Sequence, residues 1–194
     1  LVYTPIAREA FVFVVNKNNP VKTLSDAQIR AIYSGGITQW REVGGNTNPI
    51  QAWQRPKDSG SQTAMLAKVM KKTRMSSAPQ ARIATMMGDV IDVVAEYQNT
   101  QGAIGYTFRY YATQMKASND IKLLAINGIS PTVDNIRNGT YPYTVDVYTV
   151  TNEHPTAETQ KLVDWFLSPQ GQRLVEDVGY VPLHPTDHSM EKGK

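Results

Sequence analysis

Hydrophobic residues occur along this chain both as continuous runs and at helical spacing, a pattern typical of alternating strands and helices. Residues 10–15 (AFVFVV) form an unbroken apolar run of β-branched and aromatic side chains, which predicts a buried strand. Similar runs predict strands at residues 49–53, 102–107 and 121–126. Residues 143–150 (YTVDVYTV) alternate in polarity, which predicts a strand with one wetter face.

Between these runs, the spacing of apolar residues and the capping residues predict six helices. In the first, Ser25 and Gln28 form a capping-box pattern, and Gly35 or Gly36 can adopt the left-handed conformation that ends a helix. The others are expected at residues 61–72, from Asp89 to near Asn99, from Ser130 or Thr132 to before Gly139, and over 156–168 and 169–179. This alternation of strands and helices predicts an α/β fold.

The composition is that of an ordinary globular chain, with 41% hydrophobic and 19% charged residues in 194, enough for one large domain or two small lobes. The net charge of +3 is scattered, and the densest basic group (Lys68, Lys71, Lys72 and Arg74) fits the wet face of a helix, so nucleic acid is not expected as a partner. The absence of cysteine excludes disulfides, thiol catalysis and thiolate metal sites. No apolar run approaches the ~18–20 residues that span a bilayer, and no leader pattern is present.

The segment WQRPKDSGSQTAM places Arg55 four residues before a Ser-Gly-Ser that opens a predicted helix. If Ser61 lies in the first turn, the amides of Gly60, Ser61 and Gln62 have no helical partners and form a seat for an anion. The hydroxyls of Ser59 and Ser61 can donate beside those amides, and Arg55 can bond two oxygens with its planar fork. The pattern therefore indicates half of a site for a tetrahedral oxyanion.

Asp58 complicates this interpretation, because a carboxylate aimed at a bound anion would repel it. We expect Asp58 to turn away, either capping the helix amides or pairing with Arg55. The pattern by itself also allows a purely structural interpretation, in which Asp58 and Ser59 cap a helix and Arg55 is a surface residue.

Six segments occurring in order resemble the phosphate-binding proteins of ABC transporters (PstS-like), a branch of the type II periplasmic-binding-protein superfamily. They are PIAREAFVFVVNKNNPV, LSDAQIRAIYSGGITQWREVGG, an Arg followed by DSGS, GAIGY, AINGISPTVDNIRNGTYP and FLSPQGQRLVEDVGYVPL. The resemblance runs from about residue 5 to residue 183.

The resemblance implies two α/β lobes, each with a mixed sheet flanked by helices, that close on phosphate or a similar tetrahedral oxyanion by a hinge motion along two crossing strands. It implies that residues 1–16 hold an incomplete first lobe and the first crossing strand, residues 17–142 the second lobe, and residues 143–194 the return strand and C-terminal helices of the first lobe. The family places Thr where this chain has Ser61, which keeps the hydroxyl.

The roles implied for the site are specific. Arg55 clamps two ligand oxygens, while Ser59, Gly60 and Ser61 donate from hydroxyls and amides. No cofactor, no metal and no enzymatic activity are implied. The expected partners are the ligand and the permease subunits of an ABC transporter. The expected location is extracytoplasmic, with a possible membrane tether, such as a lipoprotein anchor, in residues upstream.

The glycine- and serine-rich loop and the acidic residue that the family carries in its first lobe have no counterpart here. The chain starts in what reads as a strand, so we expect that upstream residues were removed by processing or truncation. About half of the ligand shell is then missing, and we expect weak binding. Two other functions stay open: a sensory or interaction domain with the same fold, and a hydrolase of phosphate esters.

Two further groups of residues have competing interpretations. The aromatic residues Tyr106, Phe108, Tyr110 and Tyr111 could form a platform for a sugar or an amine, but core and hinge packing is the favoured interpretation. His184 and His188 have a spacing compatible with metal chelation on a helix, but the surrounding segment is polar and contains Pro185, so no metal site is expected.

Overall fold

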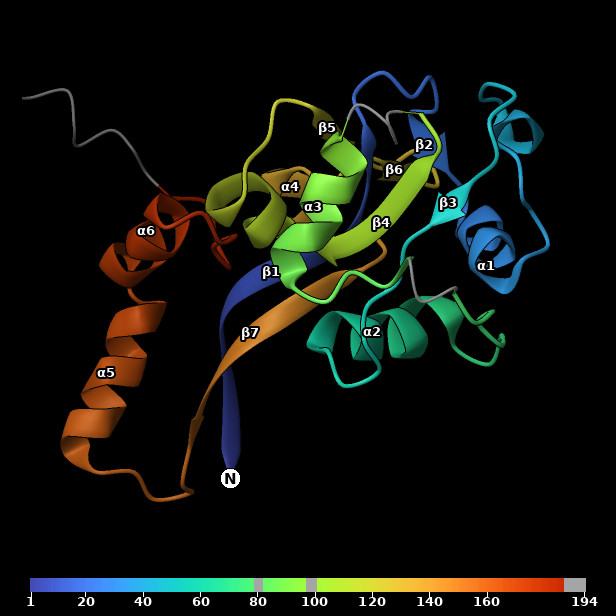
Figure 1. Ribbon diagram of the computed structural model, residues 1–194. Coiled ribbons are helices and arrows are strands. Elements are labelled where there is room, and N and C mark those ends of the chain that lie inside the picture. Colours follow the sequence, from blue (N-terminus) through green and yellow to red (C-terminus); the bar gives the residue numbers. More distant parts are fainter. Residues whose placement is uncertain (79–81, 97–100, 187–194) are drawn as a thin grey trace, which may run out of the picture.

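The longest element of the fold is β1 (Val2–Asn16), a strand of 15 residues that crosses the molecule (Figure 1). The structure is a computed structural model, and it describes residues 1–78, 82–96 and 101–186. The buried strand expected over residues 10–15 and the strand-like start of the chain are thus parts of one strand. β1 begins at Val2 because β7 (Thr144–Thr151) supplies an antiparallel partner for residues 2–10.

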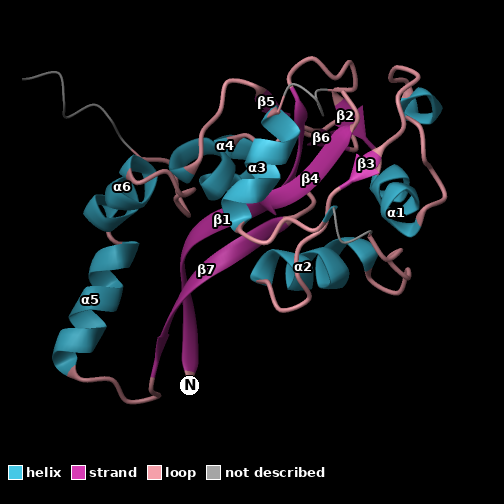
Figure 2. Cartoon of the chain, in the orientation of Figure 1, coloured by secondary structure: helices cyan, strands magenta, loops and turns pink. Residues whose placement is uncertain are grey.

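A mixed sheet of five strands is built around β1 (Figure 2). The strand order is β3 (Gln51–Ala52), β4 (Ala103–Phe108), β1 and β5 (Ile121–Leu123), with β7 paired to the other half of β1. β3 and β4 are parallel, and every other pair in this sheet is antiparallel. Helices flank the sheet, so the predicted α/β fold is confirmed.

The prediction of one strand over residues 121–126 was wrong. After β5 the chain leaves the main sheet, and β6 (Ala125–Ile126) pairs in parallel with β2 (Thr23–Leu24) in a separate small sheet. The intervening Leu124 is fully buried, and its amide donates to the carbonyl of Phe13 over 2.9 Å. The strand expected over residues 49–53 is likewise reduced to the two residues of β3.

The first helix, α1 (Asp26–Ser34), has the ends that the sequence predicts. Ser25 and Gln28 form a reciprocal capping box, with the Gln28 amide 3.1 Å from the Ser25 hydroxyl and the Ser25 amide 2.8 Å from the Gln28 side chain. Gly35 ends the helix with a φ of 85°, a conformation that favours glycine.

The other helices follow the expected order with different bounds. They are α2 (Gly60–Ala64) continued by the π-helix η2 (Met65–Met70), α3 (Met87–Ala95), α4 (Val133–Arg137), α5 (Ala157–Leu167) and α6 (Pro169–Asp177). The π-helix η5 (Tyr111–Met115) was not predicted. The expected end of α3 near Asn99 was wrong, because Glu96 already has an extended ψ of 136°. Asn99 itself lies outside the described residues. Of the two possible caps of α4, Thr132 is the one used.

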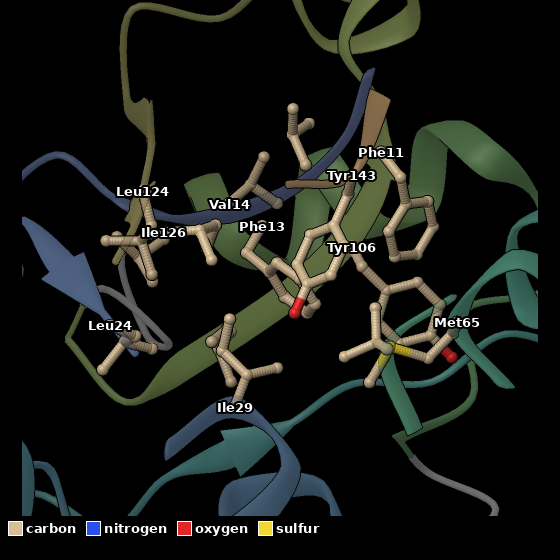
Figure 3. Close-up of a cluster of buried hydrophobic side chains, with 14 of the residues drawn as sticks. Phe11, Phe13, Val14, Leu24, Ile29, Met65, Tyr106, Leu124, Ile126 and Tyr143 are labelled. Atoms are coloured by element: carbon tan, nitrogen blue, oxygen red, sulfur yellow. The ribbon is translucent and has the colours of Figure 1, made fainter. Parts of the chain in front are cut away.

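The hydrophobic core lies on both faces of the inner half of β1. On one face, Phe11, Phe13 and Tyr106 pack against one another (Figure 3), with ring centroids 5.5–6.3 Å apart. Tyr33 of α1 packs against Phe13 and Tyr106. On the other face, α3 lies directly against β4. A Cβ on Gly105 would lie 2.5 Å from Cγ1 of Val90, so only glycine allows this approach.

The outer half of β1, β7 and the last two helices form a thinner part of the fold (Figure 1). In α5 only Val163 is buried, and the buried residues of α6 are Gly171, Gln172 and Val175. Large hydrophobic side chains stay exposed here, including Tyr3, Val150, Leu162 and Leu174. None of the helices described for this chain combines the length and the hydropathy that a membrane span requires.

Candidate anion-binding site

The side chain of Arg55 is folded inward and held by the protein. Its Nε donates to Oγ of Ser61 over 3.3 Å, and its Nη1 donates to the carbonyl oxygen of Ala84 over 2.6 Å. Only 8% of the residue is exposed. The structural interpretation of Arg55 as a surface residue is therefore wrong, and the guanidinium and the Ser-Gly-Ser segment lie together.

No carboxylate among the described residues pairs with this buried guanidinium within 4.0 Å. Burial lowers the pKa of Arg55, and the more distant negative charge of Asp89 opposes that shift. Arginine nevertheless stays charged at neutral pH, because its ordinary pKa lies far above neutrality. Within the described part of the chain, Nη2 of Arg55 has no hydrogen-bond partner. The site thus holds a fixed positive charge with one donor group unused.

The start of α2 supplies further donors. Ser59 is the N-cap, and its hydroxyl oxygen accepts from the amide of Gln62 over 3.1 Å. The expectation that the Gln62 amide would be free was therefore wrong. The amides of Gly60 and Ser61 precede it in the first turn, and neither has an acceptor among the described residues.

Gly60 and Ser61 differ in accessibility. Gly60 is exposed, and a Cβ added to it would meet no atom within 4 Å, so open space lies beside its backbone. Ser61 is 1% exposed, and its hydroxyl oxygen accepts from Arg55. Ser61 therefore positions the guanidinium and still has its own hydroxyl proton to donate.

Asp58 was expected to cap the helix amides or to pair with Arg55, and it does neither. Ser59 caps the helix in its place, and Asp58 forms no ion pair with Arg55. The residue is exposed. Its carboxylate is solvated instead of buried beside the guanidinium, which leaves the charge of Arg55 uncompensated at short range.

Tyr106 and Gln62 support the site, although sequence reasoning did not assign them to it. The hydroxyl of Tyr106 donates to the side-chain oxygen of Gln62 and accepts from the backbone amide of Arg55 over 3.1 Å. Tyr106 is 1% exposed, so the packing role expected for it is confirmed, and burial raises its pKa well above the ordinary value. The backbone at Arg55 is thereby tied to the core.

A cavity of about 690 Å³ opens beside the start of α2. Gly60, Thr63 and Ala64 of α2 line it, together with residues of η2, α3, β4, η5, β1 and β7 and with Tyr110 and Tyr180. Arg55, Ser59 and Ser61 are not among the lining residues. Gly60 is thus the point where the cavity meets the group of donors.

Of the other candidate residues, Lys68 lines the same cavity as Gly60. Lys68, Lys71, Lys72 and Arg74 are all exposed, at and just beyond η2. His184 is exposed, His188 lies outside the described residues, and no cluster of metal ligands occurs in the described ranges.

Comparison with known proteins identifies the family of the chain. A family model described as "PBP superfamily domain" matches residues 1–170, which is most of the chain. The chain therefore belongs to this family of periplasmic-binding-protein-like domains.

Its relatives include named phosphate-binding proteins. The phosphate-binding protein PstS of Bacillus subtilis is 29% identical over 172 residues, covering 87% of this chain and 53% of the relative. PstS of Staphylococcus saprophyticus is 25% identical over 197 residues, covering 97% of this chain and 60% of the relative. The chain thus spans little more than half the length of these relatives.

Solved structures share the fold. A crystal structure from Clostridium perfringens, described as a phosphate ABC transporter substrate-binding protein with bound phosphate, matches with a TM-score of 0.76 and 28% identity. The match covers 94% of this chain and 72% of that one. A phosphate transport receptor from Vibrio cholerae matches with a TM-score of 0.75 at 24% identity, covering 95% and 72% of the two chains. The PstS-like resemblance is confirmed.

Proposed function

We propose that this chain is part of an extracytoplasmic solute-binding protein that binds inorganic phosphate, or a similar tetrahedral oxyanion, for uptake by an ABC transporter. In this proposal Arg55 holds two ligand oxygens, and Ser59, Gly60 and Ser61 donate to the others. The names of the relatives and the phosphate bound in the Clostridium perfringens structure support the choice of ligand.

The observation that carries the proposal is a buried guanidinium without a carboxylate partner. Burying an unpaired charge costs several kcal/mol, so buried charges in proteins are usually paired. Arg55 is 8% exposed, and its guanidinium has hydrogen bonds only to a hydroxyl and a carbonyl among the described residues. An anion bound at this point would supply the missing negative charge.

The surrounding donors suit an oxyanion. Nη2 of Arg55, the amides of Gly60 and Ser61, and the hydroxyl protons of Ser59 and Ser61 have no acceptor within the described ranges. Backbone amides at a helix start favour anions because the helix dipole adds to their partial positive charge. A tetrahedral anion offers acceptors in several directions at once, which matches donors that come from different backbone and side-chain groups.

We further propose that residues 17–142 form one lobe of the receptor, and that β1 and β7 cross to the other lobe, to which residues 143–194 belong. The direct pairing of β1 with β7 supports this division, since a two-stranded connection can bend as a hinge. Contact with permease subunits and a location outside the cytoplasm belong to the same proposal.

The test is binding of inorganic phosphate to the full chain, followed by ³¹P NMR and by thermal unfolding. For a Kd near 1 mM, 10 mM phosphate should stabilise the chain by about 1.4 kcal/mol. Arg55→Gln should abolish this effect, and Arg55→Lys should reduce it, because lysine keeps the charge but loses the planar fork. Arg41→Gln, at an exposed position in the 3₁₀ helix Trp40–Val43, is the matched control and should bind normally. Unchanged binding by Arg55→Gln would refute the proposal.

A further inference from the structure

The two groups of donors in the anion site are joined by a short connection that is open to solvent. Residues 56–59 lead from Arg55 to the start of α2, and Lys57 and Asp58 within them are exposed. Inside this connection, the amide of Ser59 donates to the carbonyl oxygen of Pro56 over 3.0 Å, which closes one turn. A single exposed turn holds its two ends only loosely. The spacing between Arg55 and the helix amides therefore depends on contacts outside the connection.

Three groups meet at the backbone of Arg55. Its amide lies 3.1 Å from the hydroxyl oxygen of Tyr106 and 3.3 Å from the side-chain oxygen of Gln62. The Tyr106 hydroxyl in turn donates to that same oxygen of Gln62. Tyr106 is 1% exposed and Gln62 is 5% exposed. Because an unpaired polar group is costly in such a buried place, the three groups hold one another in a single arrangement.

Gln62 connects this arrangement to the start of α2. Its backbone amide donates to the hydroxyl oxygen of Ser59, and its side chain reaches the backbone of Arg55, seven residues earlier. Gly60 and Ser61, whose amides have no acceptor among the described residues, immediately precede it. The side chain of Gln62 thus fixes the donors of the helix start relative to Arg55.

Tyr106 connects the same arrangement to the core. It belongs to β4, and the centroid of its ring lies 5.5 Å from those of Phe11 and Tyr33. Burial raises the pKa of Tyr106, so the hydroxyl keeps its proton at neutral pH and donates it to Gln62. The same hydroxyl accepts from the amide of Arg55. Tyr106 therefore has no proton left for a ligand and acts on the site through Arg55.

We infer that Tyr106 and Gln62 are positioning residues, which set the affinity of the anion site by fixing Arg55 against the helix start without contacting the ligand. The inference rests on the proposed function, because it assigns two further residues to the same site. The physical reason is preorganisation, since donors already held in their binding arrangement lose less conformational freedom when the anion binds. A loosened Arg55 would have to be ordered by the ligand itself, which lowers the affinity.

The test compares Tyr106→Phe with Tyr141→Phe in the full chain. Both tyrosines are 1% exposed, and both changes remove a hydroxyl that is hydrogen-bonded inside the protein, since Tyr141 donates to the carbonyl oxygen of Phe11 over 3.2 Å. Thermal unfolding should show a similar loss of stability in the two variants. Below the unfolding transition, Tyr106→Phe should bind inorganic phosphate about fivefold more weakly than the wild type, and Tyr141→Phe should bind it normally, as measured by ³¹P NMR titration.

A spectroscopic measurement on the anion-free chain reports on Arg55 directly. The Nε–Hε resonance of Arg55, identified by its absence from the spectrum of Arg55→Gln, depends on the hydrogen bond to Ser61. It should shift or broaden in Tyr106→Phe and stay unchanged in Tyr141→Phe. A role of Tyr106 in stability alone would move neither this resonance nor the phosphate affinity of the folded protein.

Gln62→Met tests whether the two residues act together. Methionine is similar in length, but its sulfur is a weak acceptor, so only the Tyr106 hydroxyl would then accept from the amide of Arg55. Each single variant keeps one of the two acceptors, and the double variant Tyr106→Phe/Gln62→Met keeps neither. Its loss of phosphate affinity should therefore exceed the product of the two single losses.

The outcomes are distinguishable. If the wild type binds phosphate and Tyr106→Phe binds it equally well, the inference is overturned and the proposed function stands. An unchanged Arg55 resonance in Tyr106→Phe, an equal loss of affinity in Tyr141→Phe, or single losses that only multiply in the double variant would also overturn the inference alone. If the wild type binds no phosphate, the proposed function is overturned and the inference with it.

Discussion

Nε of Arg55 lies 3.3 Å from Oγ of Ser61, and both side chains are buried. The hydroxyl oxygen accepts from the guanidinium, so its proton is left for another acceptor. One serine can therefore orient the charged group and also donate to a ligand. Ser61 follows Arg55 by six residues in the sequence, and the start of α2 brings its hydroxyl back beside the guanidinium. The two residues therefore form one site.

Ser61→Ala should weaken anion binding more than the loss of a single donor would. The change removes the hydroxyl that orients Arg55 as well as one hydrogen bond to the ligand, each worth about 1–3 kcal/mol. We expect a loss of at least tenfold in phosphate affinity, measured by ³¹P NMR titration. Ser61→Thr keeps the hydroxyl and should retain binding; equal losses in the two variants would show that the hydroxyl has no role.

Gly60→Ala should separate binding from folding. The added Cβ would meet no protein atom within 4 Å, so the free energy of unfolding should stay within about 0.5 kcal/mol of the wild type or rise slightly. The methyl group would nevertheless enter the space beside the free amides and weaken phosphate binding severalfold. Chemical denaturation checks the free energy of unfolding, and a phosphate titration checks the affinity. A large loss of stability would show that Gly60 is required by the fold.

The full chain should bind phosphate with a Kd no lower than about 1 mM. Three charge-assisted hydrogen bonds contribute about 4–9 kcal/mol before the costs of ordering and desolvation, which leaves roughly 4 kcal/mol. Micromolar affinity corresponds to about 8 kcal/mol and would need donors from a second lobe. Isothermal titration checks this, and a micromolar Kd would mean that the described residues form a complete site.

The contribution of Glu9 to the stability of the fold should decrease as pH rises above the ordinary pKa of glutamate. Burial raises the pKa of Glu9, and the hydrogen bonds from Ala10 and Tyr110 only partly oppose this. The folded protein then holds this proton more tightly than the unfolded chain, so the stabilisation is present at low pH and is lost as pH rises through the raised pKa.

Glu9→Gln removes this titration, and the free energy of unfolding, measured with urea between pH 4 and 8, should vary less with pH than in the wild type. Glu158→Gln, at an exposed position in the first turn of α5, is the control for the removal of a carboxylate from the surface. If the free energy of unfolding of Glu9→Gln changed with pH in the same way as that of the wild type, the contribution of Glu9 would be contradicted.

Local sequence was enough to predict the elements whose partners are close in the chain. The capping box of Ser25 and Gln28 and the stop at Gly35 form within α1 itself, so the sequence alone determines them. The same holds for Ser59, Gly60 and Ser61 at the start of α2. The α/β class followed from the alternation of apolar runs and helical spacing.

Contacts between residues far apart in the sequence determined the position of Arg55 and the bounds of the strands. Arg55 is held by the carbonyl of Ala84, 29 residues away, and by the hydroxyl of Tyr106, 51 residues away. β1 extends to Val2 only because β7 pairs with it, and the run after β5 breaks because β6 pairs with β2. A hydrogen-bond partner across the fold leaves no periodic signal in either segment. The sequence therefore determined which groups could bind an anion, and only the tertiary structure decided that the guanidinium of Arg55 and the hydroxyl of Ser61 are buried together.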